Sequence, residues 1–203
     1  MNAPMTTASS NDAQFRPARR EDARTIAEFY RVASDGVSDY VWSKLAEPGE
    51  ELLDVGARRY ARENTEFSYQ NCELAEMAEM DEAIVGMLLG YRSPEPEPGA
   101  EPVDDPILAG LSELEIPGSF YIAGIAVAPT LRSSGIGSAM MARAHDRARA
   151  GGMTQASLIA FEPNPAVRLY ERLGYRIVDR RPVVAHPLFR YTDCDALLMA
   201  VDL

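Results

Sequence analysis

A glycine-containing turn between a strand-like and a helix-like segment carries the residue types that most clearly predict chemistry. Residues 125–138 read IAVAPTLRSSGIGS. Successive backbone N–H groups in such a turn, together with the start of the following helix, can bind a phosphate group. Arg132 adds a positive charge at the entrance, and Gly135 and Gly137 allow the backbone to approach an anion closely. The segment therefore predicts a site for a phosphate-containing ligand.

Two common phosphate-binding motifs do not fit this turn. A P-loop has a lysine between its last glycine and the Ser or Thr, but Gly137 is followed directly by Ser138, which argues against ATP or GTP hydrolysis. A dinucleotide fingerprint has a third glycine where Met140 stands, and no acid ends the strand expected after the helix, so NAD binding is weakly supported. On these residues alone, glycines that serve only packing remain an alternative.

The elements that would position this turn follow from the spacing of apolar residues. Period-two and period-3.6 patterns, with Gly and Pro at the breaks, distinguish strands from helices. Strands are expected at residues 14–19, 72–80, 83–91, 120–127, 155–161, 175–184 and 195–203, and helices at 21–34, 37–46, 50–63, 135–150 and 164–173. Residues 81–82 would form a hairpin-like connection. This order predicts one α/β domain, residues 14–203, with a mixed sheet.

Two segments lack such a pattern. Residues 1–13 are small and polar, and we expect a disordered tail there. Residues 92–119 contain six prolines and seven acids, which predicts a long acidic surface loop. Such a loop is either a lid or binding loop, or only mobile, and its acids could attract a cationic substrate.

Charge and composition exclude several classes of protein. The chain has 203 residues and a formal net charge of −11, which argues against binding a nucleic-acid backbone. Two cysteines are too few for a disulfide framework, the two cysteines and two histidines lack the paired spacing of a four-ligand zinc site, and no metal is expected. No apolar run reaches the roughly 18 residues that span a bilayer, and the first residues lack a secretory signal pattern. We therefore expect a cytoplasmic protein that binds no membrane.

Two motifs together resemble the GCN5-related N-acetyltransferase (GNAT) family. The acetyl-CoA loop of that family reads Q/R-x-x-G-x-G/A, and residues 132–137 (RSSGIG) satisfy it. Residues 164–175 (NPAVRLYERLGY) resemble its later signature of Asn, Ala, Leu-Tyr and Gly-aromatic, and residues 15–23 resemble its opening. The resemblance implies a mixed, mostly antiparallel sheet of about six to seven strands flanked by helices, and acetyl-CoA as co-substrate.

The resemblance also implies roles for individual residues. The backbone amides of Ile125, Ala126 and Val127 would pair with the pantetheine arm, and Asn164 would contact that arm. Tyr170 would protonate the leaving thiolate as a general acid; the residues alone, without the resemblance, favour a core aromatic. A bulge at Gly124 would splay the sheet at this strand. The pyrophosphate would be held by the amides of the turn, namely Ser133, Ser134, Gly135, Ile136, Gly137 and Ser138.

The general base is the part of the pattern that this sequence lacks. Some family members carry a Glu at the position of Tyr121 and others at that of Ile159, so no base is carried over from the resemblance. A water relay is one alternative. Weak candidates for the base are Glu113, Glu115, Glu162, Tyr121 and His186, while His145 is expected to be solvated.

Two functions from different classes stay open. One is an N-acetyltransferase that moves acetyl to an amine of a small molecule or protein by direct attack in a ternary complex. The other is a non-catalytic module that binds an acyl-CoA. The acceptor amine is not identified by the sequence, and a homodimer is neither required nor excluded.

Overall fold

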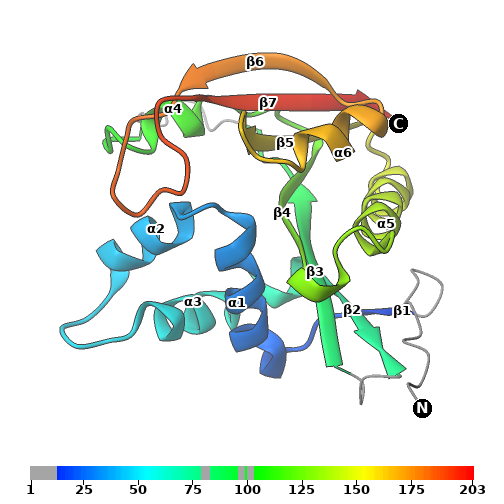
Figure 1. Ribbon diagram of the computed structural model, residues 1–203, viewed down its shortest axis with the longest axis horizontal. Coiled ribbons are helices and arrows are strands. Elements are labelled where there is room, and N and C mark those ends of the chain that lie inside the picture. Colours follow the sequence, from blue (N-terminus) through cyan, green and yellow to red (C-terminus); the bar gives the residue numbers. More distant parts are fainter. Residues whose placement is uncertain (1–12, 79–82, 96–98, 100–102) are drawn as a thin grey trace, which may run out of the picture.

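In the computed structural model, seven strands among the described residues form one sheet. The structure describes residues 13–78, 83–95, 99 and 103–203. The strand order is β1-β2-β3-β4-β5-β7-β6, and every neighbouring pair is antiparallel except β4 and β5. The predicted mixed, mostly antiparallel sheet of a single domain is confirmed (Figure 1).

The element bounds agree closely with the expected ones. The strands are β1 (Ala13–Pro17), β2 (Cys72–Met77), β3 (Ala83–Arg92), β4 (Phe120–Val127), β5 (Gln155–Phe161), β6 (Arg176–Pro182) and β7 (Asp195–Asp202). The helices are α1 (Ala23–Ala33), α2 (Val37–Leu45), α3 (Leu52–Tyr60), α4 (Ala109–Ser112), α5 (Ile136–Ala150) and α6 (Val167–Arg172), with short 3-10 turns η2 (Arg20–Asp22), η3 (Tyr69–Asn71) and η5 (Pro129–Leu131).

Three boundary predictions need comment. Ala13, expected in the tail, is the first residue of β1, and the rest of that tail lies outside the described residues. The hairpin connection at 81–82 also lies outside them. The helix expected from Asn164 starts only at Val167, because the preceding residues form a turn that the Asn164 side chain stabilises.

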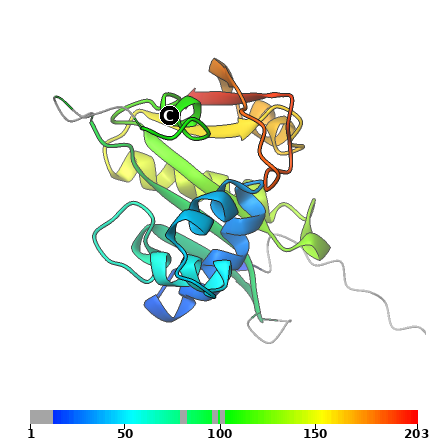
Figure 2. The ribbon, with the colours of Figure 1, turned by 90° about the vertical axis from the view of Figure 1, so that its left-hand side faces the viewer.

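Helices cover both faces of the sheet. Helix α5 lies against one face, and α1, α2 and α3 cover the other (Figures 1 and 2). Strand β3 is buried on both sides: Leu88 belongs to the core under α5, whereas Met87 and Leu89 belong to the core under α1 and α3. This two-sided burial explains why β3 is a nearly continuous apolar run in the sequence.

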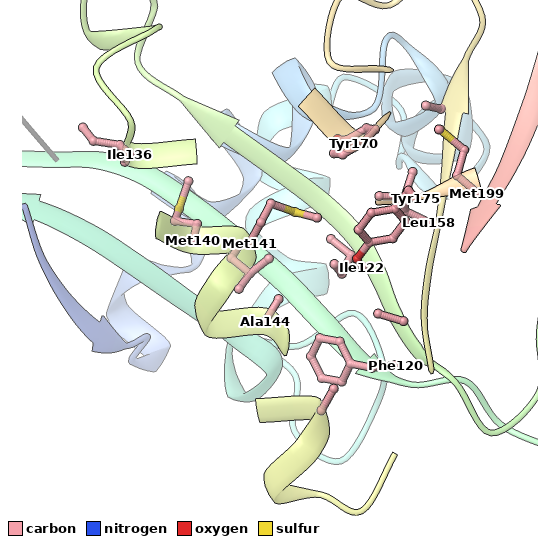
Figure 3. Packing of buried hydrophobic residues seen from close by; sticks show 14 of the residues in the cluster. Phe120, Ile122, Ile136, Met140, Met141, Ala144, Leu158, Tyr170, Tyr175 and Met199 are labelled. Carbon is pink, nitrogen blue, oxygen red and sulfur yellow. The ribbon is translucent and has the colours of Figure 1, made fainter. Parts of the chain in front are cut away.

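The core on the α5 side positions the predicted anion-binding turn. The apolar row expected on this helix is fully buried, with Ile136 and Met140 at 0% and 1% exposure. They belong to one core cluster with residues of β4 and β5 such as Phe120, Ile122 and Leu158 (Figure 3). Because α5 begins at Ile136, this packing fixes the start of the helix, and with it the glycine turn, against the sheet.

The described part of the segment 92–119 includes regular and packed structure that its composition did not suggest. It includes helix α4, and Leu114 is completely buried. Leu114 belongs to a third core cluster with Tyr40, Phe161 and Phe189. The acid Asp105 accepts a hydrogen bond of 3.0 Å from the Tyr40 hydroxyl. The stretch 103–119 is thus packed rather than structureless, because apolar residues between its prolines and acids become buried.

In the part of the chain that the structure describes, no helix combines the length and the apolar character that crossing a membrane requires.

Candidate active site

Strands β4 and β5 part from each other in the middle of the sheet. They pair in parallel only at Phe120–Ala156, Tyr121–Ser157 and Ile122–Leu158. Beyond these three pairs, β4 continues beside β3 alone and β5 beside β7 alone. One edge of each strand therefore loses its ladder partner, which leaves backbone N–H and C=O groups free for a ligand.

A bulge at Ala123 accompanies this separation. Leu89 of β3 pairs with Gly124, and the next residue of β3, Gly90, pairs with Ile122, so Ala123 is the extra residue. The bulge exchanges the two faces of β4, since Ile122 before it and Ile125 after it both contact the core under α5. The expected bulge beside Gly124 is thus present, with Ala123 as the inserted residue.

The backbone of β4 presents two N–H groups to the opening. Ala128 N donates to Val85 O of β3 at 2.8 Å. Because successive N–H groups along a strand point to opposite sides, those of Ile125 and Val127 point away from β3 and toward the separated β5. By the same alternation, the N–H of Ala126 points toward β3, so of the three predicted amides only two are available to a ligand.

The glycine turn leads from β4 into α5 through a left-handed backbone. Ser133 has φ 65° and Gly135 has φ 93°, a conformation that favours glycine. The first bond of the helix runs from Ala139 N to Gly135 O at 3.0 Å. The N–H groups of residues 136–138 therefore have no partner within the helix. They make the helix start an electropositive concavity.

A cleft of about 360 Å³ joins this turn to the opening between β4 and β5. Its volume lies within the range of about 300–1,000 Å³ that is typical of small-molecule sites. All predicted site residues line it except two: Ile136 is buried in the core, and Ser134 donates its hydroxyl hydrogen to Leu131 O at 2.7 Å. The predicted residues on its wall are Ile125, Ala126, Val127, Arg132, Ser133, Gly135, Gly137, Ser138, Asn164 and Tyr170.

Gly137 keeps the mouth of the cleft open. A Cβ atom here would lie 3.7 Å from Leu169 and 3.8 Å from Val127, which is ordinary contact. Both neighbours line the cleft, so a side chain at residue 137 would occupy part of the cleft rather than disturb the core. Gly135 and Gly137 therefore serve different purposes, one conformational and one steric.

Tyr170 lies on the inner wall of the cleft. It is 7% exposed, and its ring centroid lies 6.0 Å from that of Tyr175 (Figure 3). Among the described residues, its hydroxyl makes no hydrogen bond. Burial raises the pKa of Tyr170, and the negative charge of Asp35 raises it further. The phenol is thus kept protonated, which is the form required of a proton donor.

Asn164 uses both ends of its side-chain amide. Its Oδ1 accepts a hydrogen bond of 2.8 Å from Ala166 N, and its Nδ2 donates one of 2.6 Å to Asp35 Oδ2. The first bond stabilises the turn before α6. The second connects this turn to the turn between α1 and α2.

Sequence reasoning missed Asp35 and Arg190, both of which line the cleft. Asp35 has φ 49° and is 7% exposed. Arg190 comes from the loop between β6 and β7, and its Nη1 lies 3.7 Å from Asp35 Oδ1. The Asp-Gly pair at 35–36 signals a turn between helices, but no spacing in the sequence indicates contacts with residues more than a hundred positions away.

The five weak candidates for a general base all lie outside the cleft lining. Tyr121 packs against Tyr91 with ring centroids 5.6 Å apart. Glu113 pairs with Arg181 at 3.0 Å, and the ring of His186 contacts that of Tyr40 at 4.6 Å. Burial and then repulsion from Glu66 raise the pKa of Glu115. Ile159, which does line the cleft, cannot accept a proton.

His145 lies outside the cleft lining. His145, expected to be solvated, is half-buried and lies 2.9 Å from the Tyr175 hydroxyl, so that prediction is wrong. Desolvation lowers the pKa of His145. In the described ranges, no group of three or more His, Cys, Asp or Glu side chains is arranged to hold a metal ion.

Comparisons with known proteins agree with this architecture. The model of the acetyltransferase (GNAT) family matches residues 38–175. A solved structure described as an acetyltransferase is 20% identical, with a TM-score of 0.63 over 93% of this chain and 98% of that chain. A GCN5-related N-acetyltransferase from Kribbella flavida is 20% identical, with a TM-score of 0.61 over 96% and 100%.

A third similar fold occurs in the NatC complex bound to Gag peptide and CoA. It is 17% identical, with a TM-score of 0.57 over 95% of this chain and 99% of that chain. No curated protein sequence matches the chain. The family match spans more than half of the chain and includes both the glycine turn and Tyr170, so this chain belongs to the GNAT acetyltransferase family.

Proposed function

We propose that this protein is an N-acetyltransferase that moves the acetyl group of acetyl-CoA to an amine of a small molecule or peptide. The observation that carries the proposal is the single cleft that joins the anion-binding turn, the free N–H groups of β4 and the Tyr170 hydroxyl. Membership of the GNAT family supports acetyl transfer in general. The amine acceptor and the direct attack with both substrates bound are the finer parts of the proposal.

The residues present fit acetyl-CoA. The N–H groups of the turn at 133–138, aided by Arg132, would hold the pyrophosphate. The N–H groups of Ile125 and Val127 would pair with the amides of the pantetheine arm, as a neighbouring strand would. The NatC complex, of similar fold, is described with CoA and a peptide. That complex supports both the co-substrate and the class of acceptor.

The chain's own groups would then lower the barrier in three ways. Holding both substrates in one cleft removes much of the entropic cost of their encounter. An N–H group at the separated edge of β4 would donate to the acetyl oxygen and stabilise the negative charge that develops there. Tyr170 would donate its proton to the departing sulfur. Bound acetyl-CoA supplies the activated thioester.

The compartment and the assembly complete the proposal. Cys72 and Cys194 are free thiols, which suits the reducing cytoplasm that we propose as its location. The acceptor would be a small molecule or peptide rather than a nucleic acid or a membrane, given the net charge of −11. No observation favours a homodimer over a monomer.

Two measurements test the proposal. Acetyl-CoA should raise the melting temperature of the protein, whereas NADH and ATP should not, because the cleft and turn select the phosphopantetheine arm. Release of free thiol should then depend on an added amine, tested with spermidine, lysine and a short peptide with a free N-terminus. Stabilisation without amine-dependent thiol release would instead support a non-catalytic acyl-CoA-binding module. No stabilisation by acetyl-CoA would refute both functions.

A further inference from the structure

Asp35 is the only carboxylic acid among the described residues that line the cleft. It shares this cavity with Tyr170 and with the free edge of β4. An amine is protonated at neutral pH and must lose a proton before it can attack a carbonyl carbon. The group that accepts this proton must therefore lie on the wall of the cleft.

One oxygen of Asp35 is held and the other is free to take a proton. Oδ2 accepts the 2.6 Å hydrogen bond from Asn164 Nδ2. Oδ1 lies 3.7 Å from Arg190 Nη1, too far for a hydrogen bond, and no other described group donates to it. The carboxylate is thus oriented by one contact and keeps an unused acceptor oxygen beside the cleft.

The backbone fixes where this carboxylate stands. Asp35 has a left-handed φ of 49°, and Gly36 follows with φ 100°. A Cβ atom on Gly36 would lie 1.9 Å from Leu188 O, so the turn is pressed against the loop between β6 and β7. From the same loop, Arg190 N donates to Asp35 O at 2.9 Å. Three segments therefore hold Asp35 in place, as a group that must meet a substrate requires.

The charged and titratable groups around Asp35 tune its basicity. Burial raises the pKa of Asp35, while the hydrogen bond from Asn164 and the positive charge of Arg190 lower it by less, so the net shift is upward. Burial is the main reason that the pKa values of Tyr170 and Cys194 are raised, and the negative charge of nearby Asp35 adds to each. A carboxylate with a raised pKa is a better proton acceptor than an exposed one.

We propose that Asp35 is the general base of this enzyme, with its Oδ1 atom accepting a proton from the nitrogen of the acceptor amine. The inference rests on the proposed function. Asp35 takes one proton from the ammonium group and passes it to solvent, which frees the lone pair. The C–N bond then forms, the C–S bond breaks, and Tyr170 gives its proton to the sulfur. The nitrogen loses a second proton, which returns to Tyr170 through water, so the products are the amide, CoA thiol and one proton.

The test compares D35N with wild type and with D193N. Asn has the shape of Asp and tolerates a left-handed backbone, so D35N keeps the turn and removes only the base. Asp193 has φ 56°, is exposed and lies outside the cleft lining, which makes D193N a matched control. The measurements are kcat against pH with the best amine of the panel, the Kd for acetyl-CoA by calorimetry, and the melting temperature.

We expect D35N to lower kcat by about 100-fold, as the loss of a general base does. The wild-type kcat should fall as the pH drops through the pKa of Asp35, and D35N should lose this acid limb. The Kd for acetyl-CoA should stay within about twofold, because Asp35 acts on the amine. The defect should be smaller with methoxyamine, which is already neutral at the assay pH. D193N should behave as wild type.

Several results would overturn the role of Asp35. One is a D35N enzyme whose kcat stays within about threefold of wild type, well below the loss expected without a base. Another is a Kd for acetyl-CoA that weakens in parallel with kcat, which would show that Asp35 merely positions Asn164. If D35N does not fold, a wild-type kcat without an acid limb still refutes the base. Absence of amine-dependent turnover in wild type would instead refute the proposed function itself, and the role of Asp35 with it.

Discussion

The ring of Tyr30 occupies the space into which a Cβ atom on residue 124 would project. Such an atom would lie 2.8 Å from Tyr30 Cε2 and 2.9 Å from Cδ2. Tyr30 belongs to α1 and is itself held by Tyr60 and Phe67, whose ring centroids lie 5.5 Å and 5.8 Å away. Glycine at residue 124 therefore lets α1 approach β4 directly beside the bulge that opens the cleft.

The first prediction concerns this contact. Gly124→Ala should lower the free energy of unfolding by about 1–3 kcal/mol, the usual cost of overpacking a tightly packed site. Urea unfolding monitored by circular dichroism measures the change. Gly110→Ala is the matched control, because its Cβ atom would lie 3.7 Å from Arg181, an ordinary contact. Gly124→Ala should lower the free energy of unfolding by less when Tyr30 is also replaced by Leu. An equal decrease with and without Tyr30 would contradict the steric explanation.

The second prediction concerns the entrance of the anion-binding turn. Arg132 is exposed and lines the cleft beside the turn. Arg132→Ala should weaken acetyl-CoA binding by about fivefold to tenfold, since a charge-assisted contact to a phosphate is lost. Calorimetry at low and high salt measures the Kd for acetyl-CoA. The difference in Kd between wild type and Arg132→Ala should narrow at high salt, because salt screens the charge. Arg20→Ala, at an exposed position in η2, is the control. If Arg132→Ala binds acetyl-CoA as tightly as wild type does, the glycines of the turn serve packing only.

The third prediction separates Tyr170 from its neighbour. Tyr170→Phe should lower kcat by about 100-fold with little change in stability, because its hydroxyl serves as a proton donor and makes no hydrogen bond to a described residue. Tyr175→Phe should leave kcat unchanged. It should cost about 1 kcal/mol of stability through the lost hydrogen bond to His145. Steady-state thiol release and thermal unfolding measure the two effects, and normal turnover by Tyr170→Phe would exclude the acid role.

The fourth prediction concerns pH and the start of α1. Asp22 accepts hydrogen bonds from Arg16 Nη1 and from Arg19 N, each of 2.7 Å. Burial alone would raise the pKa of Asp22, but these bonds outweigh it and hold the pKa below its ordinary value. The resulting stabilisation is fully present above the pKa of Asp22 in the unfolded chain, about 4. It is lost as the pH falls through the lower pKa of Asp22 in the folded protein.

Asp22→Asn should therefore lower the free energy of unfolding by about 2 kcal/mol at pH 7. The difference from wild type should narrow progressively as the pH is lowered below about 4, because wild-type Asp22 is then protonated too. Urea titrations at several pH values measure this. Asp146→Asn, whose side chain is 78% exposed, should show little change at any pH. A difference that does not depend on pH would indicate lost packing rather than lost charge.

The sequence predicted well those parts of the molecule that local patterns determine. The apolar row of α5, the glycine turn before it and the strands β4 and β5 depend on spacing within short segments. The packing within 103–119 was not predicted, because prolines and acids surround the apolar residues near Leu114, which are buried only by distant elements. Asp35 could not be predicted, since its partners Asn164 and Arg190 reach it only after the chain has folded.

The separation of β4 and β5 has a consequence for the protein when no ligand is bound. Without a ligand, the middle of the sheet contains two strand edges that a neighbouring polypeptide could satisfy as well as a pantetheine arm can. In the proposed function, a co-substrate that completes the sheet also shields these edges. Bound acetyl-CoA should therefore make the protein less prone to edge-to-edge association than the ligand-free form.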